Sequence, residues 1–376
     1  MHTGKAKQGI MFQVSAIMLM LAFSFSVRAG DTTHHQKNFI LSVQGHFGYS
    51  IAHHGYMAHL IKDHLGGTEV NYIFRTCGAK NWQPLYKYPE FGVCGAYVYL
   101  GNPAQLGNLF AIYPYTNLRL NREKRKFNLA LRLGFGLAYI TKPFDRITNH
   151  QNNAIGSFVN GFVNVRLNGS LMLSKAWRMD MGVGLMHASN GAMRTPNLGL
   201  NMATVSWGVG YVFGDKGLNM HCDSVMPKIS KHWHNQVVGV VGVKELEHPG
   251  GSKYMAYGLE WNSYWAKNHK NRFGGGVELT YNNATRHEEV FDTVSVVKNS
   301  QIMQGGVKIG YVFQLDRLSF PIEWGTYFYK SAGNSDQFFH RVGLRYLVTK
   351  HLVANVTLLT HFAKADYFEF GIGYEL

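Results

Sequence analysis

The C-terminal residues 368–376 alternate strictly between apolar side chains and glycine or glutamate. The apolar positions are Phe368, Phe370, Ile372, Tyr374 and Leu376. A period of two is the period of a β-strand whose two faces meet different surroundings. No stretch after Ala29 approaches the ~18 consecutive apolar residues of a membrane-spanning helix, so a membrane form of this chain has to be a closed β-barrel.

The composition favours the same fold class. Charged residues make up 16% of the chain, against roughly 25% in ordinary soluble domains, and 46% of residues are hydrophobic, which excludes intrinsic disorder. The 42 glycines disfavour helical bundles. A soluble periplasmic β-sandwich is the alternative, but its outer faces should carry more charge. We therefore expect an all-β protein, a transmembrane antiparallel outer-membrane β-barrel.

The alternation, followed backwards through the chain, predicts about 14–16 strands. Their expected spans are 39–50, 68–76, 90–100, 107–120, 127–140, 158–172, 176–189, 200–213, 235–246, 254–265, 271–282, 302–314, 318–329, 338–348, 351–362 and 366–376. Short connections should be periplasmic turns and long ones extracellular loops. The last strand resembles that of bacterial outer-membrane proteins, most of which end in Phe where this chain has Leu376.

The chain divides into three regions by its pattern. Residues 1–29 have the basic start, apolar centre and small residues before position 30 that indicate a signal peptide, although Arg28 is unusual there and an uncleaved anchor is the alternative. Residues 30–214 hold a barrel region with the first eight expected strands. Residues 215–376 hold further barrel strands, and the sequence leaves open whether they complete the same barrel or form a second unit.

One group of polar residues interrupts an apolar strand face. His187 and Ser189 continue the apolar side of the strand 176–189, and Asn201 lies on the apolar side of the next strand. A hairpin with its loop at about 190–200 should bring Ser189 and Asn201 next to each other. The imidazole could take the serine proton for attack on a carbonyl, with amide donors stabilising the oxyanion. On the lipid-facing side, such a site would meet an acyl ester of a membrane lipid.

The surrounding residues resemble those of a known family. His187-Ala188-Ser189-Asn190-Gly191 is followed by Pro196-Asn197-Leu198-Gly199 and by Asn201, fourteen positions after the histidine. This resembles the motif of the lipid A 3-O-deacylase family of outer-membrane barrels, His-x-Ser-Asn followed by Pro-Asn-x-Gly, and the resemblance extends over about residues 39–214.

The resemblance implies a role for each matching residue. Ser189 would be the nucleophile and His187 the base, while Asn190 and Asn197 would surround the oxyanion with the Gly191 amide as a further donor. Asn201 departs from the family, whose best-known members have a carboxylate there to orient the imidazole. An Asp-to-Asn change in a serine-protease triad costs about four orders of magnitude in rate, so a non-catalytic relative is an alternative.

The leading hypothesis is thus an outer-membrane serine esterase that removes an ester-linked 3-hydroxyacyl chain from lipid A of lipopolysaccharide in the outer leaflet of a Gram-negative bacterium. A passive porin or structural barrel with a vestigial motif is the alternative, because 14–16 strands could enclose a water-filled lumen. A large barrel with an enzymatic outer wall would combine both. Another lipid ester, such as a glycerolipid, is an open choice of substrate.

Other sequence features give weaker indications of metal sites, partners or disulfides. The histidine pairs, among them His53 and His54, lack companions at metal-ligand spacing, so we expect loop or interfacial histidines and no metal site. The sequence implies no cofactor and no nucleic-acid partner. Cys77 and Cys94 could pair in an oxidising compartment, and their connectivity stays open. Oligomeric state is likewise open.

Overall fold

The computed structural model describes residues 39–78, 80–121, 126–214, 232–246, 249–292, 298–330, 336–362 and 364–376. The expected signal peptide lies outside these residues. These described residues form sixteen strands: β1 Phe39–Ile51, β2 Leu65–Arg75, β3 Glu90–Tyr99, β4 Asn108–Arg119, β5 Phe127–Ile140, β6 Val159–Met172, β7 Trp177–Ser189, β8 Leu200–Phe213, β9 Trp233–Glu245, β10 Lys253–Ala266, β11 Asn271–Asn282, β12 Met303–Leu315, β13 Leu318–Lys330, β14 Phe338–Leu347, β15 Leu352–His361 and β16 Lys364–Glu375. Each begins and ends within three residues of its expected span.

Short helical segments lie in the connections between strands. They are η1 Gly55–Leu60, α2 Trp82–Leu85, α3 Asn283–Asp292 and η2 Asn299–Ile302. α3 lies against β10. Within the described part of the chain, no helix is both long enough and apolar enough to cross a membrane.

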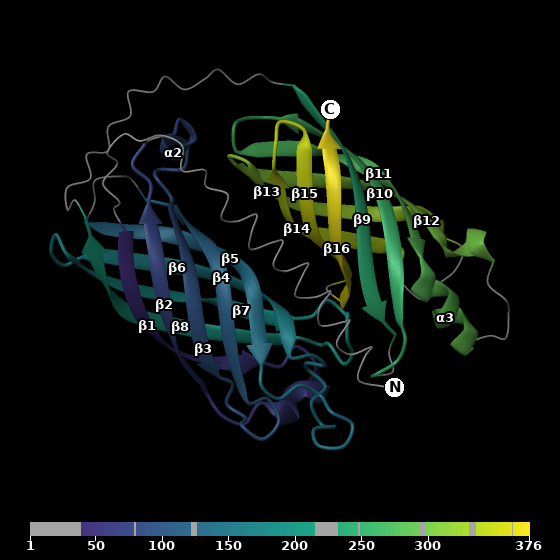
Figure 1. The fold of residues 1–376 in the computed structure, drawn as a ribbon, viewed down its shortest axis with the longest axis horizontal. Coiled ribbons are helices and arrows are strands. Elements are labelled where there is room, and N and C mark those ends of the chain that lie inside the picture. The colour runs from purple at the N-terminus through teal and green to yellow at the C-terminus, as the bar shows by residue number, and fades with distance from the viewer. Residues whose placement is uncertain are drawn as a thin grey trace. The chain divides into compact units, whose positions relative to one another are not determined.

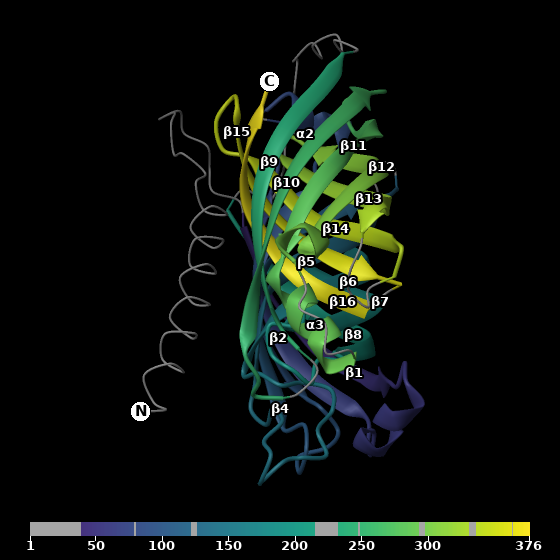
Figure 2. The same ribbon diagram turned by 90° about the vertical axis from the view of Figure 1, so that its right-hand side faces the viewer.

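The strands form two closed barrels of eight strands each (Figure 1). The first closes where β1 pairs antiparallel with β8, from Phe39 opposite Phe213 to Ile51 opposite Asn201. The second closes where β9 pairs antiparallel with β16, and Figure 2 shows its strands running obliquely around the wall. The fold class is confirmed, and the question left open by the sequence is decided, because residues 232–376 form their own barrel.

The two rings of eight strands do not provide the wide lumen that the passive-porin alternative requires. Eight strands give an interior that side chains can fill, whereas a porin-like channel needs about twice as many strands in one ring. In the first barrel the inward-facing Glu69 binds Arg132, Arg166 and His46 at 3.1, 2.6 and 2.9 Å. All four side chains are buried, so this network fills the middle of the barrel.

The second barrel is filled in the same way. Lys308 Nζ lies 2.6 Å from carboxylate oxygens of both Glu260 and Glu323. Arg341 binds Glu278 and Glu369, each at 2.6 Å. Because buried charges are tolerated only when paired, these networks explain how each barrel carries charge at its centre. The passive-porin alternative therefore loses the lumen on which it depended.

The outer face of the first barrel has the distribution of a membrane surface. An aliphatic band includes the outward-facing Val43, Val70, Ile112, Val165, Val183 and Val209. Aromatic side chains flank it at one end of the strands with Tyr72, Phe74, Trp177, Tyr211 and Phe213, and at the other end with Phe47, Tyr49, Tyr97, Phe110, Tyr139 and Phe158. An aliphatic band between two aromatic belts is typical of a barrel that spans a lipid bilayer.

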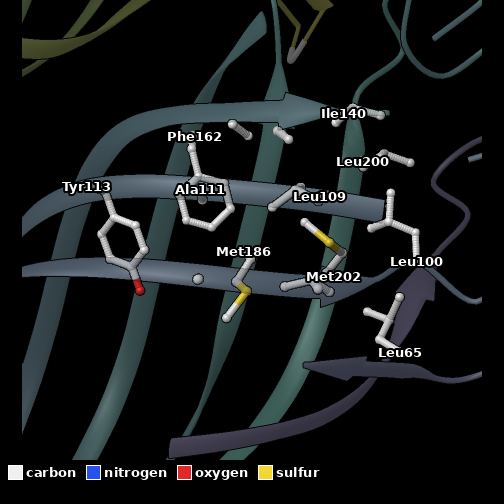
Figure 3. Packing of buried hydrophobic residues seen from close by; sticks show 14 of the residues in the cluster. Leu65, Leu100, Leu109, Ala111, Tyr113, Ile140, Phe162, Met186, Leu200 and Met202 are labelled. Atoms are coloured by element: carbon white, nitrogen blue, oxygen red, sulfur yellow. The ribbon is translucent and has the colours of Figure 1, made fainter. Parts of the chain in front are cut away.

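An apolar cluster lies inside the barrel at the end of β7 and the start of β8. Met186 pairs across the strands with Met202, and Ala188 pairs with Leu200. All four are buried in one cluster, in which Figure 3 labels Met186, Met202 and Leu200. Burying a side chain of this size contributes roughly 1.5–3 kcal/mol, so the cluster fixes which residues of β7 point inward. Their odd-numbered neighbours must then point outward.

Candidate active site

The register of β7 and β8 brings the three expected polar residues together on the outer face. His187 stands directly opposite Asn201. We expected Ser189 beside Asn201, and the residue found there lies two positions earlier on β7. The reason is the packing below: Met186 meets Met202 inside the barrel, which sets His187 against Asn201 outside. Ser189 follows at the end of β7, next to the β7–β8 loop.

Hydrogen bonds link the three side chains in series. His187 Nδ1 lies 2.6 Å from Asn201 Oδ1, and His187 Nε2 lies 3.0 Å from Ser189 Oγ. A serine hydroxyl, an imidazole and a third group that orients the imidazole form the arrangement that activates a serine nucleophile. The Asn201 amide presents its oxygen to His187 Nδ1, so it can hold the ring in the tautomer that carries its hydrogen on Nδ1.

Gly199 lets the loop pass close to the imidazole. Its φ is +82°, a region that favours glycine, and a Cβ at this position would lie 2.8 Å from His187 Cε1. Its backbone N–H donates to Ala154 O at 2.9 Å, which ties the loop to the β5–β6 connection. The glycine therefore supplies both the turn and the space for the ring.

Asn190 holds the β7–β8 loop in shape. Its Nδ2 donates to Ser157 Oγ at 2.8 Å and to Arg194 O at 2.9 Å, while its Oδ1 accepts from Arg194 N. Its backbone N–H donates to Asn197 Oδ1 at 2.9 Å. All of these N–H groups are engaged, so the expectation that Asn190 donates directly to an oxyanion is corrected: Asn190 orients Asn197 instead.

Two donors near Ser189 have no partner among the described residues. They are Asn197 Nδ2, whose amide is oriented by the bond from Asn190 to its Oδ1, and the backbone N–H of Gly191, where φ is +58°. An oxyanion needs preorganised N–H donors that are not already in use. Of the expected oxyanion group, Asn197 and Gly191 meet this condition.

The site lies at the level of one aromatic belt. Ser189 pairs with Gly161, and two residues before Gly161 on β6, Val159 pairs with Tyr139 of that belt. Aromatic belts mark the boundary between the hydrocarbon and the headgroups of a bilayer. The serine is therefore positioned where ester-linked acyl chains join the polar part of a lipid.

Two residues that the sequence pattern did not predict join the site from other connections. His53, in the β1–β2 connection, lies with Nδ1 2.9 Å from Asn201 Nδ2, and Ser157, in the β5–β6 connection, binds Asn190. Connections that follow odd-numbered strands of an up-and-down barrel share one end, and β1 is the neighbour of β8. A pair of loop histidines carries no signal of this proximity in the sequence, so only the closure of the barrel reveals it.

The sequence also singled out two cysteines and several histidine pairs. Cys77 and Cys94 are free thiols, and Cys94 Sγ lies 3.6 Å from Glu69 Oε2 inside the barrel. Across the described ranges, no cluster of three or more His, Cys, Asp or Glu side chains could hold a metal ion.

Two family models match the chain. Residues 66–210 match the family described as lipid A 3-O-deacylase (PagL), and residues 232–376 match the acyloxyacyl hydrolase C-terminal domain. The chain belongs to the lipid A 3-O-deacylase family. The first match contains His187, Ser189, Asn190, Asn197 and Asn201. The second covers the second barrel, so the family assignment accounts for both barrels.

Among solved structures, the chain is similar to several outer-membrane proteins. The outer-membrane enzyme PagL is 17% identical, with a TM-score of 0.30, over 44% of this chain and 97% of that one. A mutant of the Rh. blastica porin is 8% identical, with a TM-score of 0.22, over 90% of this chain and 100% of that one. Omp33 of Acinetobacter baumannii is 9% identical, with a TM-score of 0.16, over 91% of this chain and 98% of that one. Among curated protein sequences, no match is found.

Membership in this family agrees with the surface of the barrel. The family name is that of lipid A deacylases, which are hydrolases, and lipid A belongs to the outer membrane of Gram-negative bacteria. The two aromatic belts and the aliphatic band fit that membrane. The expected location is therefore confirmed.

Proposed function

We propose that this lipid A deacylase family member is a serine esterase that removes an ester-linked 3-hydroxyacyl chain from lipid A. The observation that carries the proposal is the series of hydrogen bonds from Asn201 through His187 to Ser189, on the outer face of the barrel at the level of an aromatic belt. A passive barrel would gain nothing from holding a serine and an imidazole 3.0 Å apart on its lipid-facing side.

Each residue has a defined part in the reaction. Ser189 Oγ attacks the ester carbonyl carbon while His187 Nε2 takes the hydroxyl proton. The Gly191 N–H and Asn197 Nδ2 donate to the oxygen that becomes negatively charged. When the tetrahedral intermediate collapses, the bond to the sugar oxygen breaks, and His187 gives that oxygen its proton.

The second half of the reaction releases the fatty acid. Water loses a proton to His187 Nε2 and attacks the acyl-serine carbonyl carbon. The same two donors stabilise the second intermediate, and collapse returns the proton to Ser189 Oγ. The products are a free 3-hydroxy fatty acid and a lipid A with one free hydroxyl, and no cofactor enters the balance.

We also propose a separate role for each of three regions of the chain. Residues 1–29 direct export and are removed, residues 30–214 form the deacylase barrel, and residues 215–376 provide the second barrel. The motif and all of the residues with proposed catalytic parts lie in the first barrel, so the second is expected to contribute no reacting group.

Mass spectrometry of lipid A tests this function. Lipid A is extracted from outer membranes that contain the wild type, Ser189→Ala or the control Ser206→Ala, a serine of β8 whose side chain is buried inside the barrel. We expect the wild type and Ser206→Ala to remove one hydroxyacyl mass, and Ser189→Ala to lower the rate at least ~10³-fold. Wild-type activity in Ser189→Ala would exclude this mechanism.

A further inference from the structure

His53 contacts the active site from a connection far away in the sequence. It lies in the exposed β1–β2 connection, just before η1, and both of its ring nitrogens have partners. Nδ1 lies 2.9 Å from Asn201 Nδ2, and Nε2 lies 3.0 Å from Leu198 O. Leu198 belongs to the same β7–β8 loop that carries Asn197 and Gly199.

The backbone carbonyl at the end of this series determines every proton position in it. A carbonyl oxygen only accepts, so His53 Nε2 must carry the hydrogen that points to Leu198 O. In the neutral ring, Nδ1 is then an acceptor. The Asn201 atom facing Nδ1 must therefore be the NH2 group, and the amide oxygen faces the other way.

The same logic continues to the nucleophile. Asn201 Oδ1 faces His187 Nδ1 at 2.6 Å, and because the amide oxygen only accepts, His187 Nδ1 must carry its hydrogen. His187 Nε2 is then unprotonated and can accept the proton of Ser189 Oγ, 3.0 Å away. All hydrogen bonds run in one direction, from Ser189 to Leu198 O.

We propose that His53 is the positioning residue that lets Asn201 replace a carboxylate in this chain. The inference rests on the esterase function proposed above and deepens it. A carboxylate offers an acceptor oxygen to the imidazole in either orientation. An amide has two different ends, and rotation by a half turn would place its NH2 group against His187 Nδ1. That ring would then carry its hydrogen on Nε2 and could no longer take the serine proton.

A double-mutant cycle at positions 53 and 201 tests the proposal. The four proteins are the wild type, His53→Ala, Asn201→Asp and the double variant, assayed for fatty acid release from lipid A in mixed micelles. The matched control is His59→Ala, because His59 is exposed in η1 and its Nε2 also contacts a backbone carbonyl, that of Gln151 at 2.8 Å. His59 anchors this connection as His53 does, but no contact joins it to Asn201 within the described part of the chain.

With Asn201 in place, we expect His53→Ala to lower kcat about threefold to tenfold, the effect of one lost hydrogen bond, with KM unchanged. In the Asn201→Asp background, the same change should not lower kcat, because a carboxylate has no wrong orientation. His59→Ala should match the wild type. An equal loss in both backgrounds, no loss with Asn201, or an equal loss in His59→Ala would overturn the proposal.

A second readout separates this inference from the proposed function. The ¹⁵N chemical shifts of the His187 ring report which nitrogen carries the hydrogen, whether or not the protein turns over lipid A. We expect hydrogen on Nδ1 in the wild type and a mixture of tautomers in His53→Ala. If wild type lacks deacylase activity, the function fails while the tautomer result still decides the role of His53. An unchanged tautomer in His53→Ala would refute that role.

Discussion

Gly199 offers a sharp test of the site because a single methyl group added there should affect catalysis more than folding. A Cβ at this position would lie 2.8 Å from His187 Cε1, whereas ordinary contacts begin at 3.4 Å. The ring would have to move by about 0.6 Å, the difference between these two distances. The bond from His187 Nε2 to Ser189 Oγ is 3.0 Å long, so a movement of this size can break it.

Gly199→Ala should have two effects, one on kcat and one on the stability of the loop. Misplacing a catalytic group by about 1 Å can lower a rate roughly 100-fold, so about 0.6 Å should lower kcat roughly tenfold or more. A left-handed φ of +82° adds about 1–2 kcal/mol of backbone strain when Ala replaces Gly. The strain destabilises the loop, while the displacement of the ring affects the chemistry.

Gly250→Ala is the matched control for Gly199→Ala. Gly250 has nearly the same φ, +81°, but no atom lies closer than 3.9 Å to the position of its Cβ. We expect only Gly199→Ala to lower kcat for fatty acid release, with KM close to that of the wild type. If Gly199→Ala retains wild-type kcat, or if Gly250→Ala loses as much, the proposed contact with the imidazole does not control the reaction.

Three further predictions concern the loop residue Asn190, the buried Glu69 of the first barrel, and the ion conductance of both barrels. Asn190→Ala removes the side-chain bonds to Ser157 and Arg194, each unmade buried bond costing about 1–3 kcal/mol, so the loop that holds Asn197 loses support and kcat should fall about tenfold; unchanged kinetics would contradict this role of the Asn190 side chain. Glu69→Ala leaves two buried arginines without their counterion and should destabilise the fold by about 3–5 kcal/mol, which urea unfolding in detergent would measure; an unchanged midpoint would contradict it. Because each barrel is filled, planar bilayers should show no porin-like conductance, and steady open channels would contradict the closed interior.

The sequence predicted the strands and the residues of the motif because both depend on local pattern. Alternation of side chains reflects the two faces of a strand, and it placed all sixteen strands. The same alternation placed His187 and Ser189 on the outer face, opposite Arg178 and Asp180, which lie inside the barrel. The spacing of the motif was then enough to identify the family.

Tertiary structure decided what depends on closure and on cross-strand pairing. Alternation has the same period in a ring of eight strands and in a ring of sixteen, so the sequence did not determine the number of barrels. The register of β7 on β8, which sets Asn201 opposite His187, depends on the packing of Met186 against Met202 inside the barrel. Only the pairing of β1 with β8 brings His53 within 2.9 Å of Asn201, a contact across 148 positions that no local pattern encodes.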